Sequence, residues 1–214
     1  MPSTINAMAP LVGVTPKGKH LTQEGQEAFI STYKSFCFRQ LPHTVLRLDM
    51  PTYETIKALS KLRMKDWAST TRWNPDAETT GLLGELATFH FFGFSPEQAL
   101  KDFKDGLSGD GGVDFHWAGE AVDVKTTRGQ ALKFRFNRSN KASRRATIIL
   151  FSHLQEEADG VFVQLLGWAW RFRLHPWMRS DSRSDFVRIE TLRREGILQP
   201  VETLKAMIEG DYHA

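Results

Sequence analysis

Cysteine is nearly absent from this chain: Cys37 is the only one among 214 residues. Neither an internal disulfide nor a cysteine-rich zinc site can therefore form. A reducing, intracellular setting such as the cytoplasm is the expectation that follows. The N-terminus also lacks a basic segment followed by an apolar one, so we expect no signal peptide.

Long apolar runs are missing as well. The most apolar stretch, 161–170, contains Gln164 and is too short to cross a bilayer, so we expect no membrane partner. A hydrophobic content of 41% is nevertheless enough for a sizeable core. Residues 1–20 contain scattered proline and glycine without periodicity and are expected to form a flexible arm. We expect residues 21–214 to form a single domain.

Acidic residues are missing from the segment 128–145, although the net charge of the whole chain is only +3. Such a basic block attracts a polyanion such as DNA, whereas a solvated basic surface without a partner is an equally weighted alternative. The basic residues of this segment are Arg128, Lys133, Arg135, Arg138, Lys141, Arg144 and Arg145.

Periodicity predicts an α/β protein with a central mixed β-sheet flanked by helices and extended by helical segments at both ends. Helices are expected over 22–40, 52–67, 78–92 and 138–146, and one or two more within 188–208; strands are expected over 113–117, 121–127, 131–137, 147–153 and 161–170. The glycine-rich and aspartate-rich loop before residue 113 separates the helical N-terminal part from the strands.

The segment around Asp123 and Lys125 combines charged and apolar residues at strand spacing. Side chains of a strand alternate between its faces, so Asp123 and Lys125 share one face and Val122 and Val124 the other. The valines are expected in the core, which leaves the charged pair facing outward or into a cleft.

A second carboxylate, Asp114, is expected to lie opposite Asp123. Ala118 and Gly119 are typical of a hairpin turn, and a two-residue or a four-residue loop gives the same register. That register pairs Phe115 with Val122 and places Asp114 and Asp123 on one face, with Cβ atoms about 5 Å apart. Two ionised carboxylates so close repel each other unless a proton or a divalent cation lies between them.

Together with Glu85 on the helix 78–92, these carboxylates offer the oxygen ligands that Mg²⁺ prefers. The backbone carbonyl of Val124 is a further ligand candidate. Lys125 is suited to orient a metal-bound water or to neutralise charge on a phosphate. Each residue taken alone is more typical of a structural role: a cross-strand ion pair for Asp123 and Lys125, and a solvent-facing helix position for Glu85.

The order of these residues resembles the PD-(D/E)xK, or restriction-endonuclease-like, nuclease superfamily, whose core runs helix, three strands, helix, strand. The resemblance is carried by Val113-Asp114, Asp123-Val124-Lys125 and Glu85, and it covers about residues 78–170. The first aspartate follows valine here instead of the proline in the superfamily's name.

The resemblance implies Mg²⁺-dependent hydrolysis of DNA phosphodiester bonds by water, and Mn²⁺ is expected to substitute. It implies that Asp114 and Asp123 are metal ligands, that Glu85 is an auxiliary ligand and that Lys125 is the catalytic lysine. An endonuclease of phage, restriction, repair or junction-resolving type is the favoured function. By analogy, a homodimer is an open arrangement, because cutting both strands of a duplex requires two sites.

Two other classes of function stay open. The first is a nucleic-acid-binding protein that keeps this fold without cleaving. The second is a structural or partner-binding protein in which the acidic residues are ordinary surface. The tryptophans at 168, 170 and 177 are more typical of a core than of a surface that stacks bases.

Overall fold

The computed structural model describes residues 23, 26, 27, 30, 39–41, 44–48, 50, 53, 54, 56–58, 60, 75–95, 97–99, 112–136, 145–157, 160–182 and 184–207. The expected arm 1–20 lies outside these residues. So does the expected basic helix 138–146, except for Arg145 and Ala146, neither of which is helical.

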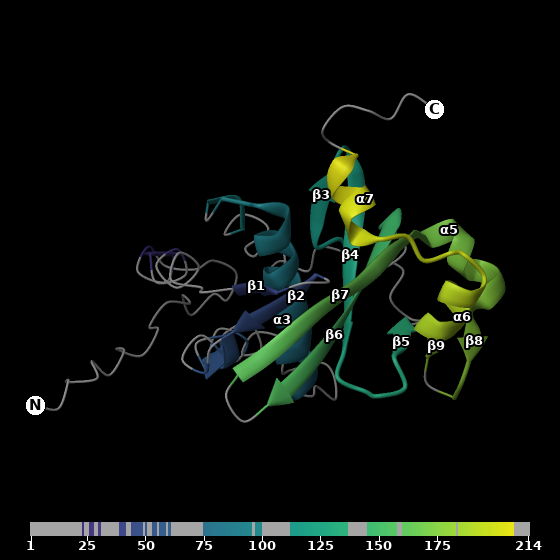
Figure 1. Ribbon diagram of the computed structural model, residues 1–214, viewed down its shortest axis with the longest axis horizontal. Helices are drawn as coiled ribbons and strands as arrows, with labels where there is room; N and C mark the ends of the chain where they lie inside the picture. The colour runs from purple at the N-terminus through teal and green to yellow at the C-terminus, as the bar shows by residue number, and fades with distance from the viewer. Residues whose placement is uncertain are drawn as a thin grey trace, which may run out of the picture.

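A six-stranded mixed sheet forms the centre of the protein, in the order β1-β2-β7-β6-β4-β3 (Figure 1). Within it, β4 and β6 are parallel and all other neighbouring strands are antiparallel. The strands are β1 (Arg39–Leu41), β2 (Val45–Leu48), β3 (Phe115–Trp117), β4 (Glu120–Thr127), β6 (Ile148–Glu157) and β7 (Gly160–Trp170). The predicted α/β class and central mixed sheet are therefore confirmed.

The helix α3 (Pro75–Phe92) packs on one face of this sheet. Its apolar residues Leu82, Leu83 and Leu86 belong to the same buried cluster as Val122 and Val124 of β4. The predicted helix 78–92 is confirmed, with a start three residues earlier because proline is well tolerated in the first turn of a helix. It ends as predicted at Gly93, which adopts a positive φ of 75°.

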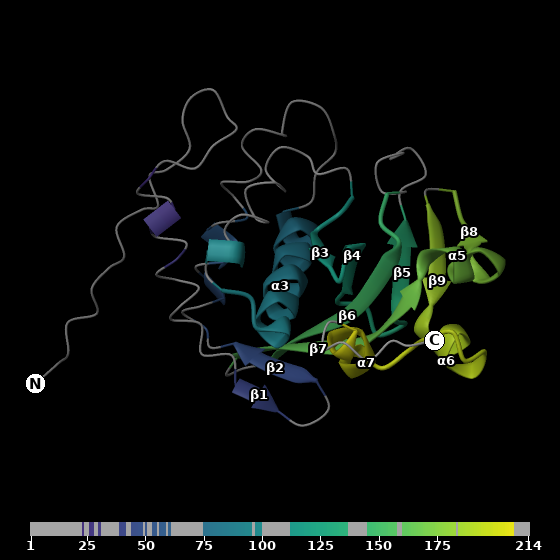
Figure 2. The same cartoon turned by 90° about the horizontal axis from the view of Figure 1, so that it is seen from above.

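The opposite face of the sheet is covered mainly by a second, three-stranded sheet in the order β5-β9-β8. Figure 2 shows α3 on one side of β4 and β6, and this second sheet on the other. Phe134, Phe136 and Val187 of the small sheet form one buried cluster with Ile149 and Phe151 of β6. The elements on this side are β5 (Lys133–Phe136), α5 (Arg171–Leu174), η2 (His175–Trp177), β8 (Arg179–Ser180), β9 (Asp185–Arg188) and α6 (Ile189–Arg194).

Helices flank the sheet as expected, since α3 covers one face and α5 and α6 pack with the second sheet on the other. The segment 131–137 does form a strand, but β5 pairs with β9 from the C-terminal part and not with the main sheet. The reason is that Phe134 and Phe136 alternate with charged residues, so the strand presents one apolar face and packs it against Phe151 across the two layers.

The N-terminal segment is not purely helical, contrary to expectation. Residues 39 and 40 belong to β1, where the sequence predicts a helix up to residue 40, and β2 was not predicted. In β2, Leu46 and Leu48 are buried while Val45 and Arg47 are partly exposed, a short alternation that pairs with β7. The described residues between 53 and 60 are helical, as expected.

The C-terminal part folds back onto the main sheet, and the expected one or two helices within 188–208 are confirmed. They are α6 and α7 (Val201–Ala206). Trp117 donates a hydrogen bond from Nε1 to the carbonyl of Leu204 at 2.9 Å, and Trp168 donates from Nε1 to the carbonyl of Pro200 at 3.0 Å. Both tryptophans therefore anchor α7, and Trp168 is a core residue.

Gly84 allows α3 to approach the sheet closely. A Cβ at this position would overlap the Thr126 hydroxyl and lie 2.8 Å from Oγ of Ser152, and these two hydroxyls are hydrogen-bonded to each other. We expect Gly84→Ala to destabilise the protein by about 1–3 kcal/mol, although alanine is the better helix former.

Gly81 on the same helix is the matched control. Its added Cβ would have no neighbour closer than 4.0 Å, so Gly81→Ala should stabilise the protein by about 0.5–1 kcal/mol. Urea unfolding of the two variants measures both effects. Equal changes in both would contradict the close approach at Gly84.

Candidate functional site

The β3–β4 hairpin has the predicted register from Phe115 to Trp117, but the predicted pairing of Asp114 with Asp123 is not among its pairs. Phe115 pairs with Val122, and Trp117 pairs with Glu120. The loop has two residues, which settles the alternative left open by the sequence. Ala118 and Gly119 both adopt positive φ, 50° and 83°, as in the type I′ turns that suit the twist of a hairpin.

Asp114 lies just before β3 and extends the hairpin through its side chain. Its backbone N–H donates to the carbonyl of Val122 at 2.8 Å, and its Oδ2 accepts the N–H of Val124 at 2.6 Å. The carboxylate thus takes the place of a backbone carbonyl in the ladder. It is fixed beside the residue that separates Asp123 from Lys125.

Asp123 and Lys125 lie on the face of β4 opposite to Val122 and Val124, as predicted. The pair does not simply face outward, however. The Asp123 residue is 1% exposed and the Lys125 side chain is 24% exposed, because the second sheet covers this face. The sequence left two alternatives open, outward or into a cleft, and the burial of Asp123 excludes the outward one for that residue.

The two carboxylate oxygens of Asp123 have different surroundings. Oδ1 accepts a hydrogen bond from the Lys125 ammonium, which forms an ion pair with it. Oδ2 is buried and has no hydrogen-bond partner among the described residues. A buried, unpaired carboxylate oxygen is energetically costly, so this atom requires a proton, a water or a cation.

The charged groups around Lys125 act on one another. Burial raises the pKa of the Asp123 carboxyl, and the nearby charges of Lys125 and Arg171 only partly oppose this. Burial lowers the pKa of Lys125, but the carboxylates of Asp123, Asp114 and Glu85 raise it, and the net direction is upward. Lys125 is therefore an ammonium at neutral pH.

We refer to Glu85, Asp114, Asp123 and Lys125 as the Asp123 cluster: contacts join Asp123 to Lys125 and Asp114 to the intervening Val124, and the charge of Glu85 acts on this group. Glu85, from the half-buried side of α3, acts on both Asp123 and Lys125, and Asp114 acts on Lys125. The elements responsible are α3, held close to β4 at Gly84, and the β3–β4 hairpin. The fourth predicted metal ligand is the backbone carbonyl of Val124, and the N–H of the same residue donates a hydrogen bond to Asp114.

Arg171 is a member of this cluster that the sequence did not reveal. It is the first residue of α5, directly after β7, and its guanidinium lowers the pKa of Asp123. It also lies over the ring of Phe136, with Cζ 5.9 Å from the ring centroid. No local pattern indicates this position, because β6 and β7 must pair before Arg171 reaches β4.

Within the ranges that the structure describes, no group of three or more His, Cys, Asp or Glu residues is arranged to hold a metal ion. The Lys125 ammonium occupies one oxygen of Asp123, and Asp114 is engaged by the backbone of Val124. The donor set itself, carboxylates with one unpartnered oxygen on Asp123, suits a hard cation such as Mg²⁺.

Several predicted DNA-binding residues make contacts within the protein. Arg128 forms an ion pair with Glu156 at 2.5 Å and donates to Oγ1 of Thr80 at 2.5 Å. Lys133 and Arg135 form ion pairs with Asp181, at 3.1 and 2.7 Å. Asp181, which is distant in the sequence, partly neutralises the basic strand.

The other basic residues of this segment are less engaged or lie elsewhere. Arg145 is exposed. Arg138, Lys141 and Arg144 lie outside the described residues. The contribution of this segment to DNA binding stays a prediction.

Comparisons with known proteins give no match. No family model matches the chain, no curated protein matches it, and no solved structure matches the fold. In the described part of the chain, no helix is both long and apolar enough to cross a membrane.

The hairpin turn offers a test of the site's scaffold. Ala118 adopts a positive φ, where alanine is strained and asparagine is tolerated, so Ala118→Asn should stabilise the protein by about 0.5–1 kcal/mol. Chemical denaturation measures this change. The matched variant Ala118→Val should destabilise it, because a β-branched residue strongly disfavours this conformation. The same stability in both variants would contradict the turn type.

The raised pKa of Asp123 predicts a dependence of stability on pH. A group whose pKa is raised on folding contributes stability at low pH that is lost as the pH rises through the folded-state value. Without metal, Asp123→Asn should therefore gain stability over the wild type as the pH is raised from about 4 to 8. A gain of at least about 2 °C in the melting temperature is expected, equivalent to roughly 1 kcal/mol for a chain of this size.

Glu157→Gln, at an exposed position at the end of β6, is the control for this measurement. Its difference from the wild type should stay nearly constant over the same pH range. The prediction is contradicted if the difference in melting temperature between Asp123→Asn and the wild type changes with pH no more than that of Glu157→Gln. Such a result would show that folding does not raise the pKa of Asp123.

Proposed function

We propose that this protein is a metal-dependent nuclease that hydrolyses phosphodiester bonds in DNA. The observation that carries the proposal is the buried, unpartnered Oδ2 of Asp123 beside Lys125, Asp114 and Glu85. A buried carboxylate oxygen in an acidic cluster with a single ammonium favours a bound cation.

The resemblance to the PD-(D/E)xK superfamily is supported by the order of elements along the chain. The elements α3, β3, β4 and β6 occur in the order that we expect for the core of that superfamily. In the same part of the main sheet, β4 pairs in parallel with β6 next to the β3–β4 hairpin. One feature departs from the expected core: the strand between β4 and β6 in the chain, β5, belongs to the second sheet. We include a restriction-endonuclease-like core in the proposal on the strength of the order of elements.

Asp123 and Asp114 would hold Mg²⁺, with Glu85 as an auxiliary ligand, and Mn²⁺ would substitute. The metal supplies Lewis-acid polarisation of the phosphate and lowers the pKa of a bound water. Lys125 is charged at neutral pH and is positioned to neutralise the developing negative charge on the phosphate. Arg171 adds a second positive charge at the same cluster.

Cleavage of supercoiled plasmid tests this proposal. With Mg²⁺ or Mn²⁺ the wild type should nick or linearise the plasmid, and EDTA should abolish this. Lys125→Ala and Asp123→Asn should each reduce the rate by at least about 100-fold, the effect of removing one preorganised group from a charged transition state.

Lys57→Ala and Glu157→Gln are the matched controls, each removing one charge outside the cluster, and both should retain full activity. Calorimetric titration of the wild type with Mn²⁺ should give saturable binding that Asp123→Asn loses. No cleavage with any of several DNA forms, together with no saturable Mn²⁺ binding, would refute the proposal.

A protein that binds DNA without cleaving it is the second candidate. It is favoured by the ion pair of Lys125 with Asp123 and by the lack of a preformed three-ligand group among the described residues. A DNA complex that shifts on a gel without cleavage, and that Asp123→Asn does not weaken, would support this candidate over the nuclease.

A further inference from the structure

An aromatic residue is exposed to solvent just after the end of β7. Phe172, in the first turn of α5, is 71% exposed, and the only other exposed large apolar residue in the described ranges is Met50, at 39%. The Phe172 ring stacks on Trp170, with centroids 6.3 Å apart and an interplanar angle of 28°. Because Phe172 is exposed, one face of its ring is available to a planar ligand.

A largely apolar pocket lies at this aromatic pair. Its volume is about 460 Å³, within the size range of small-ligand sites, and its lining includes Trp170, Phe172, Ala146 and Thr147. Thr147 hydrogen-bonds Glu120, which also lines the pocket, through its Oγ1 at 2.7 Å. The Glu120 carboxylate is therefore held at the pocket, where it can accept a hydrogen from the amino edge of a base.

The charges around the pocket suit a nucleic acid. Arg171 and His175 line it, Arg173 is exposed on the same short helix, and the exposed Arg145 directly precedes Ala146. A phosphate backbone would meet the arginines while its base meets the aromatic face. Glu120 is the single acidic residue among the lining residues, and its role there is that of an acceptor.

Arg171 connects the pocket to the Asp123 cluster. Arg171 lines the pocket and also lies close enough to Asp123 to lower the pKa of that carboxyl. The connection is structural: Ala169 pairs with Ile149, which in turn pairs with Asp123 on β4. Figure 1 shows α5 at the end of β7, where the main sheet meets the elements of the second layer.

We propose that this pocket binds an unpaired nucleobase, which stacks on Phe172 next to the phosphate held at the Asp123 cluster. The inference rests on the proposed nuclease function and deepens it: the substrate is DNA with a single-stranded portion, such as a flap, gap or junction, and not fully paired DNA. A base inside a duplex is already stacked on its neighbours and cannot occupy the pocket without being extruded.

Binding of labelled DNA to the full chain tests this proposal. Fluorescence anisotropy compares a single-stranded oligonucleotide of about 20 nucleotides with a blunt duplex of equal length, in Ca²⁺ so that hydrolysis is suppressed. Phe172→Ala should lower the ratio of single-strand to duplex affinity by at least about fivefold, the loss of one base–aromatic stack. Phe172→Trp keeps an aromatic ring and should therefore retain the wild-type ratio of single-strand to duplex affinity.

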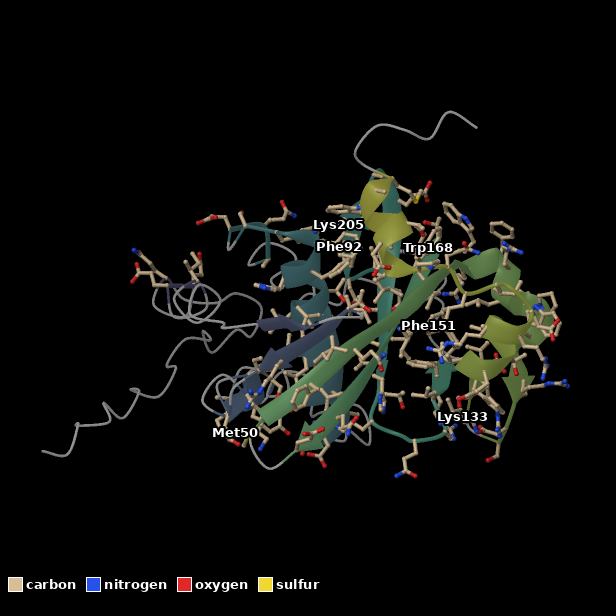
Figure 3. The ribbon with its side chains drawn as sticks, viewed as in Figure 1. Met50, Phe92, Lys133, Phe151, Trp168 and Lys205 are labelled. Carbon is tan, nitrogen blue, oxygen red and sulfur yellow. The ribbon has the colours of Figure 1, made fainter. Side chains whose placement is uncertain are left out.

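Met50→Ala is the matched control. Met50 is the other exposed apolar residue and lies at the opposite end of the molecule from α5 (Figure 3), so its substitution should leave the ratio unchanged. A second readout uses 2-aminopurine in the single strand, whose fluorescence should be quenched on binding to the wild type and less so with Phe172→Ala.

The outcomes separate the two proposals. A ratio unchanged by Phe172→Ala in a protein that binds and cleaves DNA overturns the pocket and leaves the nuclease intact. Binding to neither form of DNA overturns both. If Phe172→Ala instead converts a dimer into a monomer in sedimentation analysis with no effect on DNA affinity, the surface is a contact between copies and the inference is wrong.

Discussion

The two-sided character of β4 is the constraint on which the rest of this structure depends. Val122 and Val124 face α3 within one buried cluster, and Asp123 and Lys125 face the layer that contains the second sheet. A strand that is apolar on both faces would place no charge between the layers. Here a carboxylate is buried between them, and the cost of removing it from water is only partly offset by the charges of Lys125 and Arg171.

Three elements converge on that strand, each for an identifiable reason. The hairpin brings Asp114 onto the N–H of Val124, because its two-residue turn fixes the register. Because Gly84 has no side chain, α3 can pack closely against Thr126. This close packing brings Glu85, the next residue of the helix, to the cluster. The long β6–β7 pairing returns the chain to β4 and delivers Arg171. The chemistry that we propose arises where these three meet.

The candidate base pocket follows from the same geometry. Trp170 is the last residue of β7 and packs against the main core, so the chain turns into α5 with Phe172 exposed beside it. In contrast, the basic strand β5 is less available than its composition indicates, since Lys133 and Arg135 are paired with Asp181. Our proposal of a base-binding site therefore rests on the residues around α5 and not on those of β5.

The sequence by itself determined the local features: the alternation that assigns Val122 and Asp123 to opposite faces, the hairpin register from Phe115 to Trp117, and the helix that ends at Gly93. These follow from side-chain periodicity and turn chemistry, which act over a few residues. Only the tertiary structure decided that β5 leaves the main sheet, that Asp123 is buried, and that Asp181 and Arg171 reach residues far away in the chain. Those outcomes depend on which apolar faces pack together, and a pattern within one segment does not contain the partner that covers it.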